Sequence, residues 1–195
     1  MSAIRAFIAI DFSAEIHERL DYVTGQLKSR LPDVPVRWVP AKNIHLTLKF
    51  LGDVSVSNLE MLNRIIRSEA KKINPFEISV GELGAFPSIH RPRVIWVGIE
   101  APPELNMLQR GIENETSRLG YARERRPFSP HLTTGRVSRN ATAGHIHQIA
   151  DVLGDCKIGF LGATRIQAVY LYRSDLRPHG AVYTRLYNAD LGEPI

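Results

Sequence analysis

The sequence predicts an α+β protein of two pseudo-symmetric lobes, each a mostly antiparallel sheet with helices on its outer face, around a central cleft. Three observations support this fold class. Segments with the two-residue apolar alternation of strands are interleaved with segments that have the spacing of amphipathic helices. The tripeptide His-Leu-Thr occurs at residues 45–47 and again at 131–133, 86 positions apart. Ser88 and Ser174 repeat at the same spacing, as do Pro92 and Pro178, which indicates an internal duplication.

The elements expected in the first half of the chain follow from apolar periodicity, turn residues and helix caps. In order, they are a strand over 5–11, an amphipathic helix from Ser13 that Pro32 and Pro35 end, a strand over 43–50 that Gly52-Asp53 ends, a helix with a capping box of Ser57 and Glu60, and strands over 76–83 and 93–99.

The second half repeats this order, and no long linker divides the chain, so residues 1–195 are expected to form a single bilobal domain. Its elements are a helix from Pro103 to Gly120, a loop with Arg123, Arg125 and Arg126, a strand over 129–134, a short helix over 142–153, and a strand pair over 165–172 and 181–190.

Composition excludes several classes of protein. One cysteine, Cys156, gives no disulfide framework, and it is expected to be a buried apolar residue. The apolar run 6–10 is too short to span a membrane and has no cleavage pattern of a signal peptide. We therefore expect a cytoplasmic, monomeric protein with no membrane partner. Its net charge of +5 mildly favours anionic partners.

The two His-Leu-Thr segments predict the site. On a strand, residues two apart share a face, so His45 lies beside Thr47 and His131 beside Thr133, while the intervening leucines point into the core. Imidazoles exchange protons near neutral pH, and hydroxyls donate hydrogen bonds to developing negative charge. Two such pairs brought together are suited to acid/base chemistry on a phosphate without a covalent intermediate.

Metal and nucleotide cofactors are not expected. His145 and His147 lie two apart on an expected helix and do not share a face, and the sequence has no glycine-rich phosphate-binding loop. The remaining histidines, His17, His90 and His179, are expected to lie on the surface or at caps, with His90 and His179 in basic turns that border the cleft.

The segments His45-Leu46-Thr47-Leu48 and His131-Leu132-Thr133-Thr134 resemble the paired His-x-Thr-x motifs of the 2H phosphoesterase superfamily. Their flanks, 43–52 and 126–131, and the opening 7–11 are similar to the RNA 2′,3′-cyclic phosphodiesterases, also called 2′-5′ RNA ligases. The resemblance covers nearly the whole chain.

This resemblance implies hydrolysis of an RNA 2′,3′-cyclic phosphodiester to a 2′-phosphomonoester, without a metal or nucleotide cofactor. It assigns His45 as the proton donor to the leaving 3′ oxygen and His131 as the base that activates water. Thr47 and Thr133 would hold the phosphate of an RNA end. The residues alone leave donor and acceptor unassigned, because the two motifs are nearly symmetric.

A basic residue just past the second motif often approaches the phosphate in this family, which makes Arg136 a candidate. Strand parity puts Arg136 on the face opposite His131 and Thr133, unless a bulge at Gly135 re-aims it. The equivalent residue of the first motif is Phe50. Trp38 and Phe128 precede the motifs and are expected to be core aromatics rather than base-stacking residues.

Two alternatives remain open at this point. The same site would catalyse the reverse reaction, 2′-5′ joining of RNA halves, although no site for an activated nucleotide is visible. The chain would otherwise be a non-catalytic module that binds RNA ends.

Overall fold

The computed structural model describes residues 3–178 and 180–192. Within these residues no helix is long and apolar enough to cross a membrane. The elements are β1 (Ala3–Ile10), α1 (Ala14–Arg30), β2 (Val36–Trp38), the 3-10 turn η1 (Ala41–Asn43), β3 (Leu46–Ser55), the 3-10 turn η2 (Val56–Asn58), α2 (Leu59–Lys71), β4 (Phe76–Phe86), β5 (Val94–Glu100), α3 (Pro103–Arg118), β6 (His131–Val137), α4 (Ala143–Asp155), β7 (Phe160–Ile166), β8 (Ala168–Arg177) and β9 (Gly180–Asp190).

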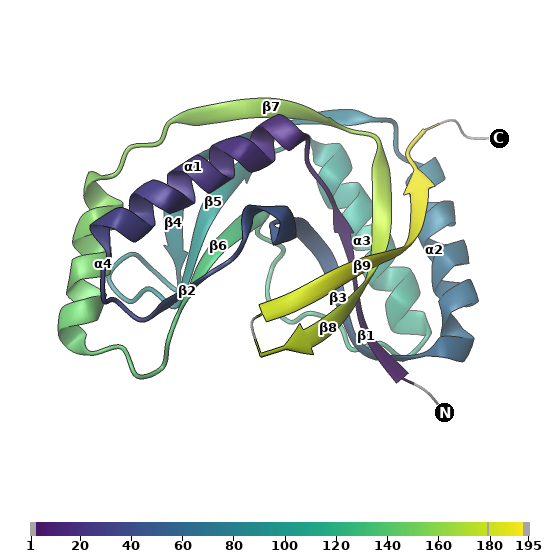
Figure 1. Ribbon diagram of the computed structural model, residues 1–195. Helices are drawn as coiled ribbons and strands as arrows, with labels where there is room; N and C mark the ends of the chain where they lie inside the picture. The colour runs from purple at the N-terminus through teal and green to yellow at the C-terminus, as the bar shows by residue number, and fades with distance from the viewer. Residues whose placement is uncertain (1–2, 179, 193–195) are drawn as a thin grey trace.

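The strands form two antiparallel sheets, which confirms the predicted fold class (Figure 1). We call the sheet with strand order β3-β1-β8-β9 sheet A and the sheet with order β2-β6-β5-β4-β7 sheet B. The first His-Leu-Thr segment enters sheet A through β3, and the second begins β6 of sheet B. Strand β2 belongs to sheet B although β3, the next strand along the chain, belongs to sheet A, so the short segment 39–45 connects the two lobes.

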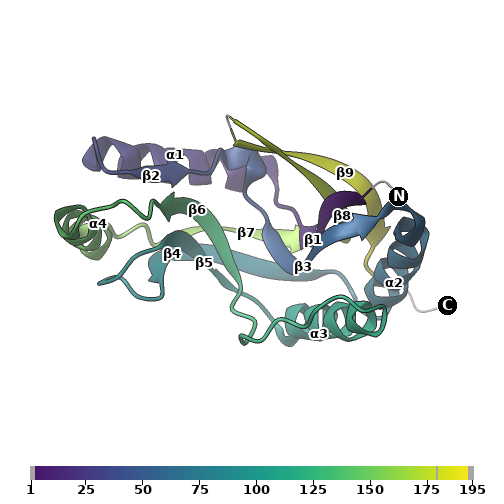
Figure 2. The same cartoon turned by 90° about the horizontal axis from the view of Figure 1, so that it is seen from below.

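Helices α1 and α3 each pack on the lobe that does not contain the strand before them (Figure 2). Helix α1 follows β1 of sheet A but packs on β7 of sheet B, near α4, to which Arg30 and Asp155 connect it by an ion pair of 3.5 Å. Helix α3 follows β5 of sheet B but packs on β3 of sheet A, beside α2. Each lobe is therefore covered by one helix that comes from a strand of the other lobe, and a single apolar core runs through both.

The first long helix forms where the sequence predicts it. Ser13 caps α1 by accepting a hydrogen bond from the Ile16 backbone N–H. The apolar stripe of Ile16, Leu20, Val23 and Leu27 is buried, as its spacing requires.

Three predicted boundaries are wrong. Strand β3 continues to Ser55 because Gly52, at a φ of 71°, lets the chain pass a bulge opposite Ala6. Helix α2 starts at Leu59, with no side-chain cap, so the capping box of Ser57 and Glu60 does not form. The last strand pair, expected from residue 165, is formed by β8 and β9 and starts at Ala168, because Phe160–Ile166 form a separate strand, β7, at the edge of sheet B.

A buried ion pair holds the arginine-rich loop before β6 in place. The Lys49 ammonium, 2% exposed, donates to Glu113 Oε1 at 2.6 Å and to the Ala122 carbonyl at 2.5 Å. The same Glu113 oxygen accepts from the Glu124 backbone N–H, and Arg123 donates to Asn114 on α3. These bonds hold the loop that leads into the second His-Leu-Thr segment.

Candidate active site

His45 immediately precedes β3 and continues its alternation, on the face of sheet A opposite the main core. On this strand Leu46 and Leu48 are buried in the main core, whereas His45 and Thr47 are half-buried on the opposite face. Phe7 of β1 stacks on the His45 ring with centroids 4.6 Å apart, and Tyr183 of β9 lies edge-on to it at 5.1 Å. The first histidine therefore sits in an aromatic wall.

His131 has a similar place on sheet B. Leu132 is buried in the core, while His131 and Thr133 lie half-buried on the other face. Phe86 lies edge-on to the His131 ring at 4.8 Å, and Trp96 is 6.5 Å from it. Trp96 in turn covers Gly84, where a Cβ would lie 2.2 Å from the indole ring.

Both rings are oriented by the backbone two residues earlier. His131 Nδ1 lies 2.7 Å from the Ser129 carbonyl oxygen, so Nδ1 carries the proton and Nε2 is available as an acceptor. The backbone of Asn43 hydrogen-bonds to the His45 ring in the same way and raises its pKa. Asn43 is itself held by a 2.9 Å bond from its side chain to the Ala181 carbonyl of β9.

Each threonine is followed by a β-bulge. On β3, Thr47 pairs with Ala9 and Lys49 with Ile8, so Leu48 is the extra residue. On β6, Thr133 pairs with Trp96 and Gly135 with Ile95, so Thr134 is the extra residue. The two bulges fall at equivalent positions of the repeat, one residue after each threonine.

The bulge on β6 corrects the parity argument for Arg136. The extra residue Thr134 is fully buried and donates a hydrogen bond to the Ile95 carbonyl, so alternation resumes one residue late. Arg136 is exposed and shares the face of His131 and Thr133, and its positive charge contributes to lowering the pKa of His131. Phe50 stands at the equivalent position of sheet A and is 63% exposed, so the two halves differ chemically here.

Tyr183 of β9 interacts with groups from both sheets. Its ring lies edge-on to the His45 ring beside sheet A. Burial raises the pKa of Tyr183, whereas the positive charges of Arg136 and Arg37 on sheet B and of Arg5 on sheet A lower it. Tyr183 therefore lies beside His45 on one sheet and within reach of the charges of Arg136 and Arg37 on the other.

Burial makes both histidines weak bases in the absence of substrate. It lowers the pKa of His45 to about 4, more than the Asn43 bond and the Asp11 charge raise it. Burial also lowers the pKa of His131, against the bond from Ser129, and the Arg136 charge lowers it further. Both imidazoles are neutral at pH 7.

The sequence did not predict a polar network beside His45. His17, expected at the surface or at a cap, places Nε2 3.1 Å from Asp11 Oδ1 and Nδ1 2.8 Å from the Ala41 carbonyl. Both partners are acceptors, so the protonated ring is the form that donates to both at once. The Asp11 bond raises the pKa of His17 accordingly. His17 thus connects η1, the turn that leads into His45, to α1 and to Asp11 at the end of β1.

Asp11 extends this network to β8 and β9. Its Oδ2 accepts from the Tyr172 hydroxyl at 3.2 Å and from Arg185 at 3.1 Å. Burial raises the pKa of Asp11, but the bonds from His17, the Phe12 N–H and Tyr172 outweigh it, so the pKa lies below its usual value. Tyr172 stacks on Phe7 at 5.3 Å, so the network supports the aromatic wall. Alternation on β1 places Asp11 and Phe7 on one face, a signal that the sequence does contain.

The other candidate residues lie away from this space or have structural contacts. His145 caps α4 through a capping box with Thr142, and His147 faces Asp151 on the same helix. His90 is exposed in the β4–β5 turn, and His179 lies outside the described residues. Trp38 and Phe128 pack against the core, and Cys156 is half-buried at the end of α4. Across the described residues, no three His, Cys, Asp or Glu side chains are grouped to hold a metal ion.

Comparison with known proteins identifies the family of this chain. A family model described as LigT like Phosphoesterase matches residues 10–96, which include β3 and its first motif. A relative from Methanothermobacter thermautotrophicus named RNA 2′,3′-cyclic phosphodiesterase is 36% identical over 183 residues, which cover 93% of this chain and 95% of the relative. The chain belongs to the LigT-like phosphoesterase family. An Archaeoglobus fulgidus protein of the same name is 31% identical, with 94% and 98% covered.

Solved structures of the family share the whole fold. The crystal structure of Escherichia coli LigT complexed with 3′-AMP has a TM-score of 0.76 and 28% identity, over 97% of this chain and 99% of that one. The crystal structure of TT0787 of Thermus thermophilus has a TM-score of 0.79 and 25% identity, with 98% and 100% covered. The match extends through both sheets, well beyond the segment that the family model covers.

Proposed function

We propose that this LigT-like phosphoesterase is an RNA 2′,3′-cyclic phosphodiesterase that hydrolyses the cyclic ester to a 2′-phosphomonoester by metal-independent acid/base catalysis with two histidines. The names of its relatives support the activity. The observation that carries the mechanism is the equivalent setting of His45 and His131, each on a strand face beside a threonine, with the ring fixed by backbone two residues earlier.

The chemistry needs one base and one acid. His131 accepts a proton from water as the water oxygen bonds to phosphorus, and the bond from phosphorus to the 3′ oxygen breaks. His45 donates a proton to that leaving oxygen, which gives a 3′-hydroxyl and a 2′-phosphate. The division into donor and acceptor follows the family resemblance of the two motifs.

The other three candidates stabilise the charge that develops on the phosphate. Thr47 and Thr133 donate from their hydroxyls to the non-bridging oxygens, and the Arg136 guanidinium supplies positive charge from the same face as His131. Phe50 occupies the matching position on sheet A, so cationic stabilisation comes from one side only.

Substrate binding allows His45 to take up from solvent the proton that it later donates. With a pKa of about 4, His45 is neutral at pH 7 in the free protein. An anionic cyclic phosphate beside the ring stabilises its protonated form and raises this pKa. His45 therefore becomes a competent acid only in the complex.

We further propose that residues 1–195 form one bilobal domain that arose by internal duplication. The orders β1-α1-β3-α2 and β5-α3-β6-α4 correspond, and the bulged residues Leu48 and Thr134 lie 86 positions apart, like the two histidines. The proposed partner is an RNA end with a 2′,3′-cyclic phosphate, which this chain meets as a monomer in the cytoplasm.

The proposal is tested by product analysis. Purified protein in EDTA is incubated with a dinucleotide that ends in a 2′,3′-cyclic phosphate, and the product phosphate is located by ³¹P NMR. A 2′-phosphate supports the proposal. A 3′-phosphate product contradicts it. Tight binding without turnover also contradicts it and would favour a non-catalytic RNA-end-binding module.

A further inference from the structure

Two arginines lie directly opposite each other on neighbouring strands of sheet B. Arg37 of β2 pairs with Arg136 of β6 in the antiparallel register, so their side chains share one face. Like charges at such positions destabilise a sheet. Among the described residues neither guanidinium forms an ion pair with an acidic side chain. The cost is offset if a bound anion lies between or beside them.

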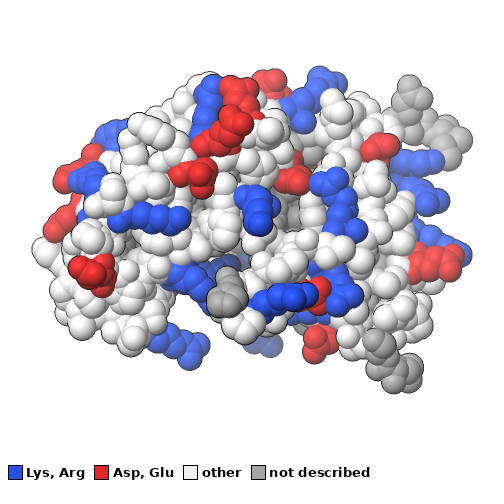
Figure 3. Space-filling model, viewed as in Figure 1, with Lys and Arg blue, Asp and Glu red and all other residues white. Residues whose placement is uncertain are grey.

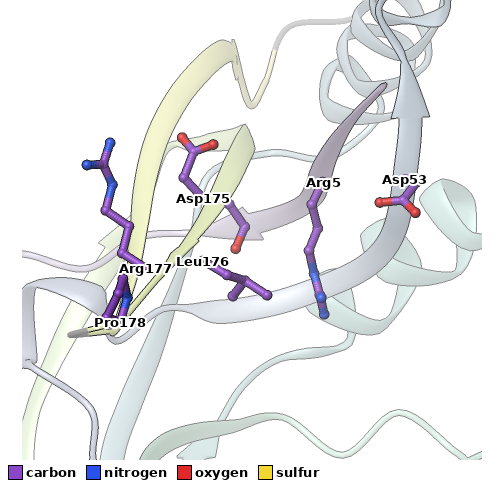
Figure 4. A pocket seen from close by; sticks show the side chains of 7 residues that line it. Arg5, Asp53, Asp175, Leu176, Arg177 and Pro178 are labelled. Atoms are coloured by element: carbon purple, nitrogen blue, oxygen red, sulfur yellow. The ribbon is translucent and has the colours of Figure 1, made fainter. Parts of the chain in front are cut away.

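A third arginine approaches from sheet A. Arg5 lies two residues before Phe7 on β1, so both side chains are on the face that carries His45. Arg5 lines an open hollow of about 630 Å³ between β1 and the end of the β8–β9 hairpin, together with Arg177 and the carboxylates Asp53 and Asp175 (Figure 4). Ser174 lines the same hollow and is the register partner of Tyr183 on β9.

The charges of the three arginines converge on Tyr183. Its ring lies 5.0 Å from Phe7 and 5.1 Å from His45, and the charges of Arg136, Arg5 and Arg37 all act on its hydroxyl. Figure 3 shows Lys and Arg side chains on both sides of the place where the β8–β9 hairpin approaches the other lobe. Arg136 is therefore one of three arginines whose charge acts on Tyr183, the tyrosine that lies beside His45.

We propose that Arg5, Arg37 and Tyr183 form a second anion subsite, which binds the phosphate on the 5′ side of the terminal nucleotide while Arg136 binds the cyclic phosphate. The inference rests on the proposed function. One ribose separates the two phosphates, and opposite residues in an antiparallel pair have Cα atoms about 4.5–5.5 Å apart. Adjacent guanidinium groups thus suit two phosphates of one nucleotide. The enzyme would select a polynucleotide end over a free nucleoside cyclic phosphate.

Two substrates that differ by one phosphate test the subsite. One is a nucleoside 2′,3′-cyclic phosphate with a 5′-hydroxyl, and the other is the same molecule with a 5′-phosphate. We expect wild type to favour the 5′-phosphorylated form in kcat/KM by about tenfold or more, through KM, as one or two charge-assisted contacts provide. Arg37→Gln and Arg5→Gln should each reduce this ratio, and the double variant should bring it close to one.

Arg64→Gln is the matched control, since it removes an exposed arginine of α2 that pairs with Glu60 and should leave the ratio unchanged. A wild-type ratio near one, or a ratio that both variants retain, overturns the subsite. If wild type hydrolyses neither substrate, the proposed function fails, and the subsite is judged by binding. Wild type should then bind a nucleoside 2′,5′-bisphosphate more tightly than the nucleoside 2′-phosphate, and Arg37→Gln should abolish this difference in affinity. The same difference in both proteins would overturn the subsite.

Discussion

The aromatic wall around His45 predicts an unusual titration. Phe7 is 2% exposed and stacks on the imidazole, which keeps water from one face of the ring. Burial lowers the pKa of His45 from 6.5 to about 4. At about 1.4 kcal/mol for each pKa unit, this shift corresponds to about 3 kcal/mol of differential stabilisation of the neutral imidazole.

Phe7→Ala should open this face to water and raise the pKa of His45 by about one unit or more, toward 6.5. NMR titration of the histidine Cε1–H signals measures it, with His45→Asn to assign the resonance. Phe7→Leu keeps an apolar cover and is the matched control, expected to titrate near wild type. Thermal unfolding checks that the alanine variant is folded, since the lost packing costs about 3–5 kcal/mol.

The lowered pKa of His45 also makes the free energy of unfolding depend on pH. Between pH 6.5 and 4 the folded protein binds fewer protons at His45 than the unfolded chain, so this residue lowers the free energy of unfolding as the pH falls through that window. A wild-type His45 that titrates near 6.5, or a Phe7→Ala protein whose His45 titrates as in wild type, would refute the reasoning.

Three other changes test the surrounding structure. Because the Asp11 bond raises the pKa of His17, the stability advantage of wild type over His17→Gln should be full below pH 6.5 and be lost as the pH rises through the folded pKa, which thermal unfolding at several pH values measures. Lys49→Met should cost about 3–5 kcal/mol in urea unfolding by leaving buried Glu113 unpaired, and adding Glu113→Leu should recover most of it; equal losses in both proteins would contradict this. Gly84→Ala should cost about 1–3 kcal/mol and change the tryptophan fluorescence, since its Cβ displaces Trp96; an unchanged spectrum would contradict this.

Local patterns were sufficient to predict the layers of the fold. Ser13 and the stripe that follows it define α1, and the alternation around each histidine defines its face, because helix caps and side-chain periodicity depend only on neighbouring residues. The crossing of α1 and α3 between the lobes depends on packing between segments far apart in the chain, which periodicity does not encode.

The errors at the site have the same physical origin. A bulge adds one residue to a strand only relative to its partner, so the parity of Arg136 cannot be read without the register of β5 and β6. His17 has no sequence neighbour to mark it, since its acceptors, Asp11 and the Ala41 carbonyl, converge on it only after folding. The position of Asp11 on the same face as Phe7 could have been predicted from the alternation along β1.

The central claim is that two histidines share the work of proton transfer. The most direct measurement is kcat/KM of wild type, His45→Asn and His131→Asn, in EDTA, on a 5′-phosphorylated nucleoside 2′,3′-cyclic phosphate across pH. Each variant should lose about 10²–10⁴-fold in rate while keeping its fold, and the wild-type profile should be a bell with both limbs below pH 6.5, as the lowered pKa values of both histidines require. Variants near wild-type activity, or a wild type that EDTA inactivates, would contradict it.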